Sequence, residues 1–262
     1  MIKKDRNSRK LGKTIHWLEV CESTNKLAYH ECIHGNAEDG TIWLSDHQTQ
    51  GRGQRGNSWI SDPGKNLLFS FNLNLKQASL NNQFFLSKVI SIGIKEGIEH
   101  FFSRESKSTE SLKIKWPNDI YWGNQKIGGI LIENQISGGQ WKFSIIGIGI
   151  NINQTDFILK SATSIKNILG KEIDRQKILS DIIFFVEENL TLFEEENWKE
   201  INQTYHQNLL GIGKEIKFQE TNNQTVINGV IQGVEDNGKI KIETNLGVKF
   251  YEIKEISLIL SE

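Results

Sequence analysis

This chain of 262 residues has few cysteines, two in all, and almost no net charge, formally −1. Two cysteines exclude a disulfide scaffold and a paired-cysteine metal motif, and they suit a reducing compartment such as the cytoplasm. A charge so near zero argues against a nucleic-acid coat and a polybasic membrane binder. No window is apolar for long enough to span a bilayer, and the basic start leads to no signal core. We therefore expect a cytoplasmic globular protein that binds neither DNA nor membrane.

Several catalytic motifs are also missing. The six histidines form no HExxH or HxH pattern, which argues against a catalytic zinc site. The sequence has no GxSxG elbow and nothing else that suggests a covalent nucleophile. Chemistry by positioning and charge stabilisation is therefore favoured.

The hydrophobic pattern predicts alternating helices and strands, followed by a change of character in the last fifty residues. Residues 1–13 are basic and lack apolar periodicity, so we interpret them as a flexible tail. A first helix is expected to run to His34, with a side chain of Ser23, Thr24 or Asn25 as its N-cap. Two further helices are expected at 84–102 and 178–198. Strands are expected at 41–46, 66–75, 113–116, 128–134 and 141–150, the second of them half-buried. Short strands with tight turns after residue 210 indicate a small barrel of its own.

The densest candidate motif is a glycine-rich loop at residues 48–59, which read QTQGRGQRGNSW. Its glycines have the spacing of the dinucleotide fingerprint, but that fingerprint should open a helix, and here a strand follows. A Walker phosphate loop needs lysine where Asn57 stands. Glycine backbones, the guanidinium groups of Arg52 and Arg55 and the indole of Trp59 suit an anion and a stacked base. We therefore favour an anion-binding loop over a surface loop with solvated arginines.

A second candidate lies at residues 113–134, which read KIKWPNDIYWGNQKIGGILIEN. Pro117 disfavours helix for the preceding residue, so Asn118 and Asp119 should lie at a turn after a strand. If the two halves of this segment pair as a hairpin, Asp119 comes near Lys126. The carboxylate could then hold Mg²⁺, and the ammonium could neutralise a phosphate or carboxylate. An Asx turn with an ordinary surface lysine explains the pattern equally well.

A third candidate is the apolar strand that ends in GIGININ, residues 147–153, with glycines on one face. Such glycines admit the close approach of a ligand or of another backbone. On these residues alone, tight packing within a sheet is the simpler interpretation.

Together, in this order and spacing, these segments resemble the biotin protein ligases. The resemblance covers residues 14–262 and rests on five segments, which read STN at 23–25, QTQGRG at 48–53 with Trp59, KWPND at 115–119, KIGGIL at 126–131 and GIGIN at 147–151. It implies an α+β fold. The expected domains are a mixed-sheet catalytic domain with flanking helices at 14–209 and a small SH3-like β-barrel at 210–262.

The resemblance also implies the activity, which is ATP-dependent activation of biotin as biotinyl-5′-adenylate and its transfer to a lysine of a biotin carboxyl carrier domain. MgATP and biotin would bind, the acceptor would belong to a biotin-dependent carboxylase, and the ligase would be a monomer or homodimer. A lipoate or octanoate protein ligase or transferase of related fold is the main alternative. A non-catalytic biotin or nucleotide-binding module and a nucleic-acid-binding protein are weaker ones.

The family pattern implies roles for particular residues. Those expected to contact biotin are Ser23, Thr24, Asn25, Gln48, Arg52, Gly53, Gln54 and Lys126. Those expected at the nucleotide are Arg55, Trp59, Lys115, Asn118 and Asn151. Catalysis is expected to depend on Lys126, Arg52 and Asp119, with Asp119 also the expected Mg²⁺ ligand.

Two departures from the family pattern stand in the loop, where Gln54 and Asn57 replace arginines that the family commonly has. Fewer guanidinium groups near the phosphate should change how firmly the adenylate is retained. Because the catalytic region begins near Ile15, we also expect no N-terminal helix-turn-helix and hence a ligase that is not a repressor.

Overall fold

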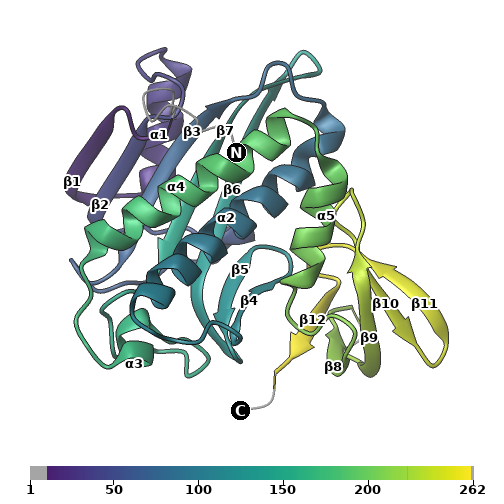
Figure 1. Cartoon of the computed structure of the whole chain (residues 1–262). Coiled ribbons are helices and arrows are strands. Elements are labelled where there is room, and N and C mark those ends of the chain that lie inside the picture. The colour runs from purple at the N-terminus through teal and green to yellow at the C-terminus, as the bar shows by residue number, and fades with distance from the viewer. Residues whose placement is uncertain (1–10, 223, 261–262) are drawn as a thin grey trace.

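The computed structural model describes residues 11–222 and 224–260, and its main element is a seven-stranded mixed sheet (Figure 1). The strands, in chain order, are β1 (Ile15–Cys21), β2 (Ile42–Gln48), β3 (Leu67–Asn74), β4 (Leu112–Lys115), β5 (Asp119–Trp122), β6 (Gln125–Ser137) and β7 (Gln140–Ile150). Their order across the sheet is β1-β2-β3-β7-β6-β5-β4. Strands β1 and β2 are parallel, and the other neighbours are antiparallel.

A second, five-stranded antiparallel sheet follows near the C-terminus, in the order β11-β10-β9-β8-β12. Its strands are β8 (Glu215–Glu220), β9 (Val226–Val234), β10 (Ile240–Thr244), β11 (Gly247–Tyr251) and β12 (Ile256–Ile259). The predicted α+β class is therefore confirmed. The expected flexible tail at 1–13 falls mostly outside the described residues, which begin at Leu11.

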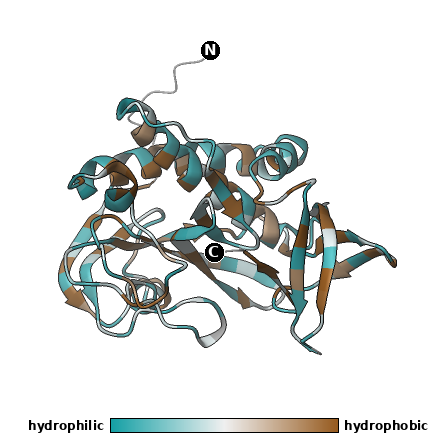
Figure 2. Cartoon of the chain, turned by 90° about the horizontal axis from the view of Figure 1, so that it is seen from below, coloured by the Kyte–Doolittle hydropathy of each residue, from teal (hydrophilic) through white to brown (hydrophobic). Residues whose placement is uncertain are grey.

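Two long helices, α2 (Gln83–Arg104) and α4 (Arg175–Glu194), cover one face of the large sheet, whereas loops and a shorter helix lie at the other (Figure 2). They approach each other closely because α2 carries glycine at the crossing. A Cβ on Gly93 would lie 2.5 Å from Cα of Val186, and one on Gly97 would lie 2.6 Å from Cα of Ile182. No helix in the described part of the chain is long and apolar enough to cross a membrane.

Strand β3 is buried on both faces, so the prediction that it is half-buried is wrong. All of its residues except Asn74 are buried, including Ser70 at 0% exposure. The reason is helix α1 (Thr24–Ile33), which packs on the face of the sheet opposite α2 and α4. There Ala28 forms a small second core with Trp43 and Ile145.

The remaining helices are shorter, and one of them changes an expected boundary. The predicted helix 178–198 is wrong at its end, because α4 stops at Glu194 and α5 (Trp198–Gln207) begins four residues later. Glu196 adopts a left-handed backbone at φ 54°, and Asn197 N donates to Leu192 O (2.9 Å), which closes α4 without the usual glycine. The sequence analysis did not predict the following elements: strands β1, β5 and β12, helix α3 (Ile165–Leu169) and the short 3₁₀ helices η2 (Gln54–Gly56) and η3 (Leu80–Asn82).

Candidate functional site

A cavity of about 1040 Å³ opens on the face of the sheet that carries α1. It is lined by every sequence-predicted site residue whose side chain is described, namely Ser23, Thr24, Asn25, Gln48, Arg52, Gly53, Gln54, Trp59, Lys115, Asn118, Asp119, Lys126 and Asn151. Arg55 is the exception, because its backbone lies in η2 but its side chain falls outside the described part of the chain. Segments far apart in the sequence thus meet at one site.

The start of α1 supplies uncharged polar groups to this cavity. Thr24 N and Thr24 Oγ1 both donate to Gln48 Oε1, at 2.7 and 3.1 Å. Ser23 is the N-cap residue by backbone conformation, yet its side chain makes no capping hydrogen bond. The prediction that a side chain of this segment caps the helix is therefore wrong. These side chains are used for the cavity, with Ser23, Thr24 and Asn25 all at most 4% exposed.

Two residues that the sequence analysis missed hold this polar cluster. Ser70, on β3, has its Oγ 2.7 Å from Thr24 Oγ1 and 2.6 Å from Asn25 Oδ1. Glu133, on β6, accepts a hydrogen bond from Asn25 Nδ2 at 2.8 Å. The other Glu133 oxygen lies 3.1 Å from an Arg52 guanidinium nitrogen. Glu133 therefore ties the glycine-rich loop to α1.

Strand β7 determines where the side chains of the site can lie, through its two glycines. A Cβ on Gly147 would lie 2.0 Å from Asn25 Oδ1, and one on Gly149 would lie 2.6 Å from the Trp59 ring. The close approach allowed by these glycines is therefore made by site side chains. Because the two positions are separated by two strand residues, or roughly 7 Å, Asn25 and Trp59 lie one after the other along β7.

The glycine-rich loop folds back on itself beside the cavity. Gly53 N donates to Asn57 O (2.7 Å), and Trp59 N donates to Gly51 O (2.9 Å), with an isolated bridge between Arg52 and Ser58. This arrangement carries the Trp59 indole over β7. Within the described part of the chain the buried Trp59 Nε1 has no hydrogen-bond partner, which leaves a donor for a ligand.

Cationic side chains lie at the Trp59 end. Strands β5 and β6 pair as the predicted hairpin, and Lys126 Nζ lies 2.6 Å from Asp119 Oδ1 and 5.7 Å from the Trp59 ring centre. Lys115 lies nearby, with its ammonium 5.4 Å from the Tyr121 ring centre. Burial lowers the pKa of Lys115; Asp119 opposes this shift and the like charge of Lys126 adds to it. Such a pair of cations suits two anionic groups brought together.

The amides of Asn118 and Asn151 fix the backbone of this end. Asn118 Nδ2 donates to Ile130 O, and Ile130 N donates back to Asn118 O at 3.1 Å. Asn151 Nδ2 donates to Thr163 O at 3.0 Å. Both side chains are therefore held in place while they line the cavity.

The C-terminal sheet also contributes to the cavity, which the sequence analysis did not predict. Its lining residues are Thr221, Ile253, Lys254, Ile256, Ser257 and Leu258. Among residues 11–222 and 224–260, no three His, Cys, Asp or Glu side chains gather as a metal site. A metal at Asp119 would therefore take most of its ligands from a bound molecule and from water.

The chain matches known proteins over most of its length. Residues 17–151 match the Biotin/lipoate A/B protein ligase family. The bifunctional ligase/repressor BirA of Bacillus subtilis is 30% identical over 253 residues, which cover 95% of this chain and 75% of that protein. The biotin–[acetyl-CoA-carboxylase] ligase of Mycobacterium tuberculosis is 23% identical over 84% of this chain and 80% of that protein.

A solved structure extends the match to three dimensions. The biotin protein ligase from Aquifex aeolicus in complex with biotin and ATP is 31% identical and aligns with a TM-score of 0.77. The alignment covers 95% of this chain and 100% of that chain.

Proposed function

The chain belongs to the biotin/lipoate A/B protein ligase family, and from this membership we propose how its residues carry out the reaction of a biotin protein ligase. In the first step a carboxylate oxygen of biotin attacks the α-phosphorus of ATP. The bond from that phosphorus to the bridging oxygen breaks, pyrophosphate leaves, and biotinyl-5′-adenylate remains. In the second step a lysine amine of a carrier domain attacks the acyl carbon. AMP leaves, and the amine proton passes to solvent.

The polar end of the cavity fits the ureido ring of biotin, which presents two N–H donors and one carbonyl acceptor. Thr24, Asn25 and Gln48 offer both donors and acceptors there and are already held by hydrogen bonds. A site that is fixed before the ligand arrives loses little conformational entropy on binding. We therefore place the ring beside α1, with the carboxylate directed along β7 toward Trp59.

The cationic end fits the reacting groups. The biotin carboxylate and the α-phosphate are both anions, so their approach needs positive charge that is already in place. Lys126 lies between Asp119 and the Trp59 ring, which is where the two groups would meet. Arg52, Arg55 and Lys115 would supply further charge from the loop and from β4, and we assign Trp59 and Asn151 to the adenine.

Magnesium is proposed as part of MgATP. The residues fit a metal held mainly by phosphate oxygens and water, since Mg²⁺ commonly takes only one or two protein carboxylates. Asp119 is the proposed protein ligand, and the metal would neutralise charge on the β- and γ-phosphates. The Asp119 carboxylate is the group we also propose to meet the incoming lysine ammonium.

The acceptor, the location and the organisation of the chain are proposals that rest on the relatives and on the sequence. The Mycobacterium tuberculosis relative is named for acetyl-CoA carboxylase, so we propose a carrier domain of such a carboxylase as partner. Cys21 and Cys32 are both free, which suits the cytoplasm. We retain the division into a catalytic domain at 14–209 and a C-terminal domain at 210–262, and a monomer or homodimer as the assembly.

One observation carries the proposal most directly: a single cavity has fixed amide and hydroxyl groups at one end and lysines at the other. The test is to incubate the protein with MgATP, labelled biotin and a carrier domain. We expect label on one carrier lysine and release of one AMP per biotin transferred. Incorporation of lipoate or octanoate in place of biotin would contradict the proposal.

A further inference from the structure

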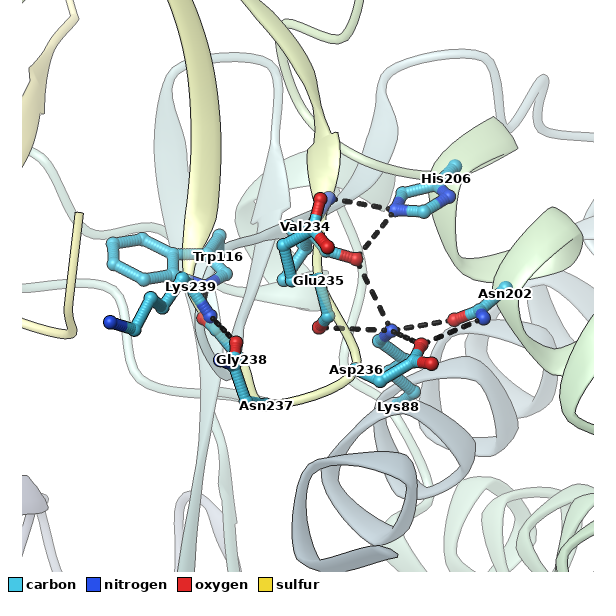
Figure 3. Close-up of polar contacts among 10 residues, drawn as sticks. All are labelled: Lys88, Trp116, Asn202, His206, Val234, Glu235, Asp236, Asn237, Gly238 and Lys239. Atoms are coloured by element: carbon cyan, nitrogen blue, oxygen red, sulfur yellow. Dashed lines mark hydrogen bonds and ion pairs between the residues drawn. The ribbon is translucent and has the colours of Figure 1, made fainter. Parts of the chain in front are cut away.

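Lys88 is a fully buried lysine on α2 that lies outside the cavity, at the base of the β9–β10 turn (Figure 3). Its Nζ lies 2.6 Å from Asn202 Oδ1 and 3.4 Å from each of the Val234 and Glu235 carbonyl oxygens. The rings of Phe84, Phe85 and Tyr205 surround it, with centres 4.9 to 5.7 Å away. A buried ammonium needs such acceptors, so it fixes the carbonyls that it contacts.

The carboxylates near Lys88 belong to the turn, and α5 supplies an amide and an imidazole. Asp236 Oδ1 is 3.9 Å from the ammonium and accepts a hydrogen bond from Asn202 Nδ2 at 3.0 Å. Burial lowers the pKa of Lys88 to about 8, against the opposing effect of Asp236 and Glu235. His206 completes the group, because its Nε2 accepts from Val234 N at 2.8 Å. Helices α2 and α5 therefore hold both ends of Val234–Asp236.

The same turn reaches the active site through Trp116. The Trp116 Nε1 donates to Gly238 O at 2.9 Å, in a contact that is buried. Gly238 packs directly on the ring of Phe84, where a Cβ would lie 2.6 Å from a ring carbon. Residues Asn118 and Asp119 follow Trp116 by two and three positions and line the cavity. The turn therefore supports the segment that presents them.

We propose that Lys88 is a positioning residue, which acts through the β9–β10 turn and the Trp116–Gly238 hydrogen bond to hold Asn118 and Asp119 in the geometry that biotin activation needs. The inference rests on the proposed function for its kinetic readout. It extends that function because it gives the C-terminal sheet a role in the first step, before any carrier domain arrives. The biotin ring end, on α1 and β3, lies outside this chain of contacts.

The test uses Lys88→Met and Asn202→Ala, with Asn189→Ala as the matched control. Asn189 is also a buried helix residue whose amide reaches α2, where it donates to Glu96 at 2.7 Å, and its hydrogen bonds within the described residues all lie on α2 and α4. For both Lys88→Met and Asn202→Ala we expect kcat of biotin-dependent pyrophosphate exchange to fall about ten-fold, since small misplacements of reacting groups are costly. We expect KM for biotin to change less than about two-fold, because uniform binding is untouched.

A second measurement, hydrogen exchange of residues 116–122, does not depend on activity. We expect the amides of these residues to exchange faster than in the wild type in both Lys88→Met and Asn202→Ala. In the Asn189→Ala control they should exchange at the wild-type rate, at a similar loss of thermal stability. If Lys88→Met does not fold, Asn202→Ala decides the outcome. Unchanged exchange at 116–122, or KM for biotin rising with kcat unchanged, would overturn the role of Lys88. A wild-type protein without pyrophosphate exchange would instead overturn the proposed function. The hydrogen-exchange result would then decide by itself whether Lys88 holds residues 116–122 in place.

Discussion

The two faces of the seven-stranded sheet are made by alternate residues of the same strands, yet they serve different purposes. On β7, Ile146, Ile148 and Ile150 join the core under α2 and α4. Gly147 and Gly149, between them, leave room for the Asn25 and Trp59 side chains of the cavity. One face of β7 is filled by apolar side chains, whereas on the other face its two glycines leave room for side chains of the cavity.

Glycine has a different effect on each side of the molecule. On α2, Gly93 and Gly97 let the backbone of α4 come close, which is a matter of packing density. On β7, glycine admits groups that would contact a ligand. The role of a glycine in a helix or strand therefore depends on which group fills the space beside it.

Removal of the cation at the cavity should have the largest effect. For Lys126→Ala we expect biotin-dependent pyrophosphate exchange to fall roughly 10²–10³-fold, as for loss of one preorganised electrostatic group. Stability should change by no more than about 1 kcal/mol, because the pair with Asp119 is partly solvated. Exchange assays and urea unfolding measure the two effects, with Lys113→Ala as control. Exchange at the wild-type rate would remove Lys126 from the mechanism.

A pair of glycine substitutions tests the comparison directly. Gly147→Ala should displace Asn25 and raise KM for biotin about ten-fold or more. Gly97→Ala should leave KM unchanged and lower the free energy of unfolding by about 1–3 kcal/mol, because the added methyl meets the α4 backbone. Biotin titrations and denaturant unfolding of both variants provide the measurements. Equal losses of stability with unchanged KM in both would break the distinction between the two faces.

Ser70 tests whether a buried hydroxyl on the cavity face supports binding. Ser70→Ala removes a partner from Thr24 and Asn25, and we expect biotin affinity to fall about ten-fold, as for a buried polar group left unpaired. Ser91 is an equally buried serine on α2, where its hydroxyl donates to Ser87 O at 2.8 Å. Ser91→Ala should leave the affinity unchanged. Calorimetric titration with biotin would show equal affinities for both variants if the hydroxyl of Ser70 has no such role.

The smallest expected effect concerns Gln54 in the glycine-rich loop. Gln54→Arg adds a guanidinium that can form charge-assisted hydrogen bonds to the adenylate phosphate, so we expect its release to slow by a few-fold. Stability should not change, because Gln54 lines the cavity from the short 3₁₀ helix η2 and is only half-buried. Release is measured by chase of labelled adenylate with unlabelled biotin. Gln50→Arg lies outside the cavity lining and should not slow release; a similar effect there would point to charge alone.

The site was more predictable than the details that support it. Each motif segment is short and local, so the spacing of Asp119 and Lys126 could predict their meeting across a hairpin. Ser70 and Glu133 could not be found in this way, because their partners on α1 lie 45 and 108 positions away in the chain. The alternation of apolar and polar residues in 66–75 predicted that Ser70 lies on a solvent-exposed face of its strand, since no local signal showed that α1 covers it.

Prediction of the fold had the same limit, because a sequence pattern shows local structure and not the contacts between distant segments. Long apolar helices such as α2 and α4 were evident from periodicity, but the end of α4 was not, because Glu196 takes the left-handed position in place of glycine. Strand β12 was not predicted, and it is held in the second sheet by pairing with β8. Its contribution to the cavity therefore depends on tertiary pairing that no single segment indicates.

The cavity lining runs from Ser23 to Leu258, nearly the whole described length of the chain. Protein synthesis proceeds from the N-terminus, and early segments can fold while later ones are still being made. The groups assigned to biotin and nucleotide are thus complete by Asn151, but the wall from β12 is translated more than a hundred residues later. Until β12 has been synthesised, a nascent chain would therefore hold a pocket that lacks this wall.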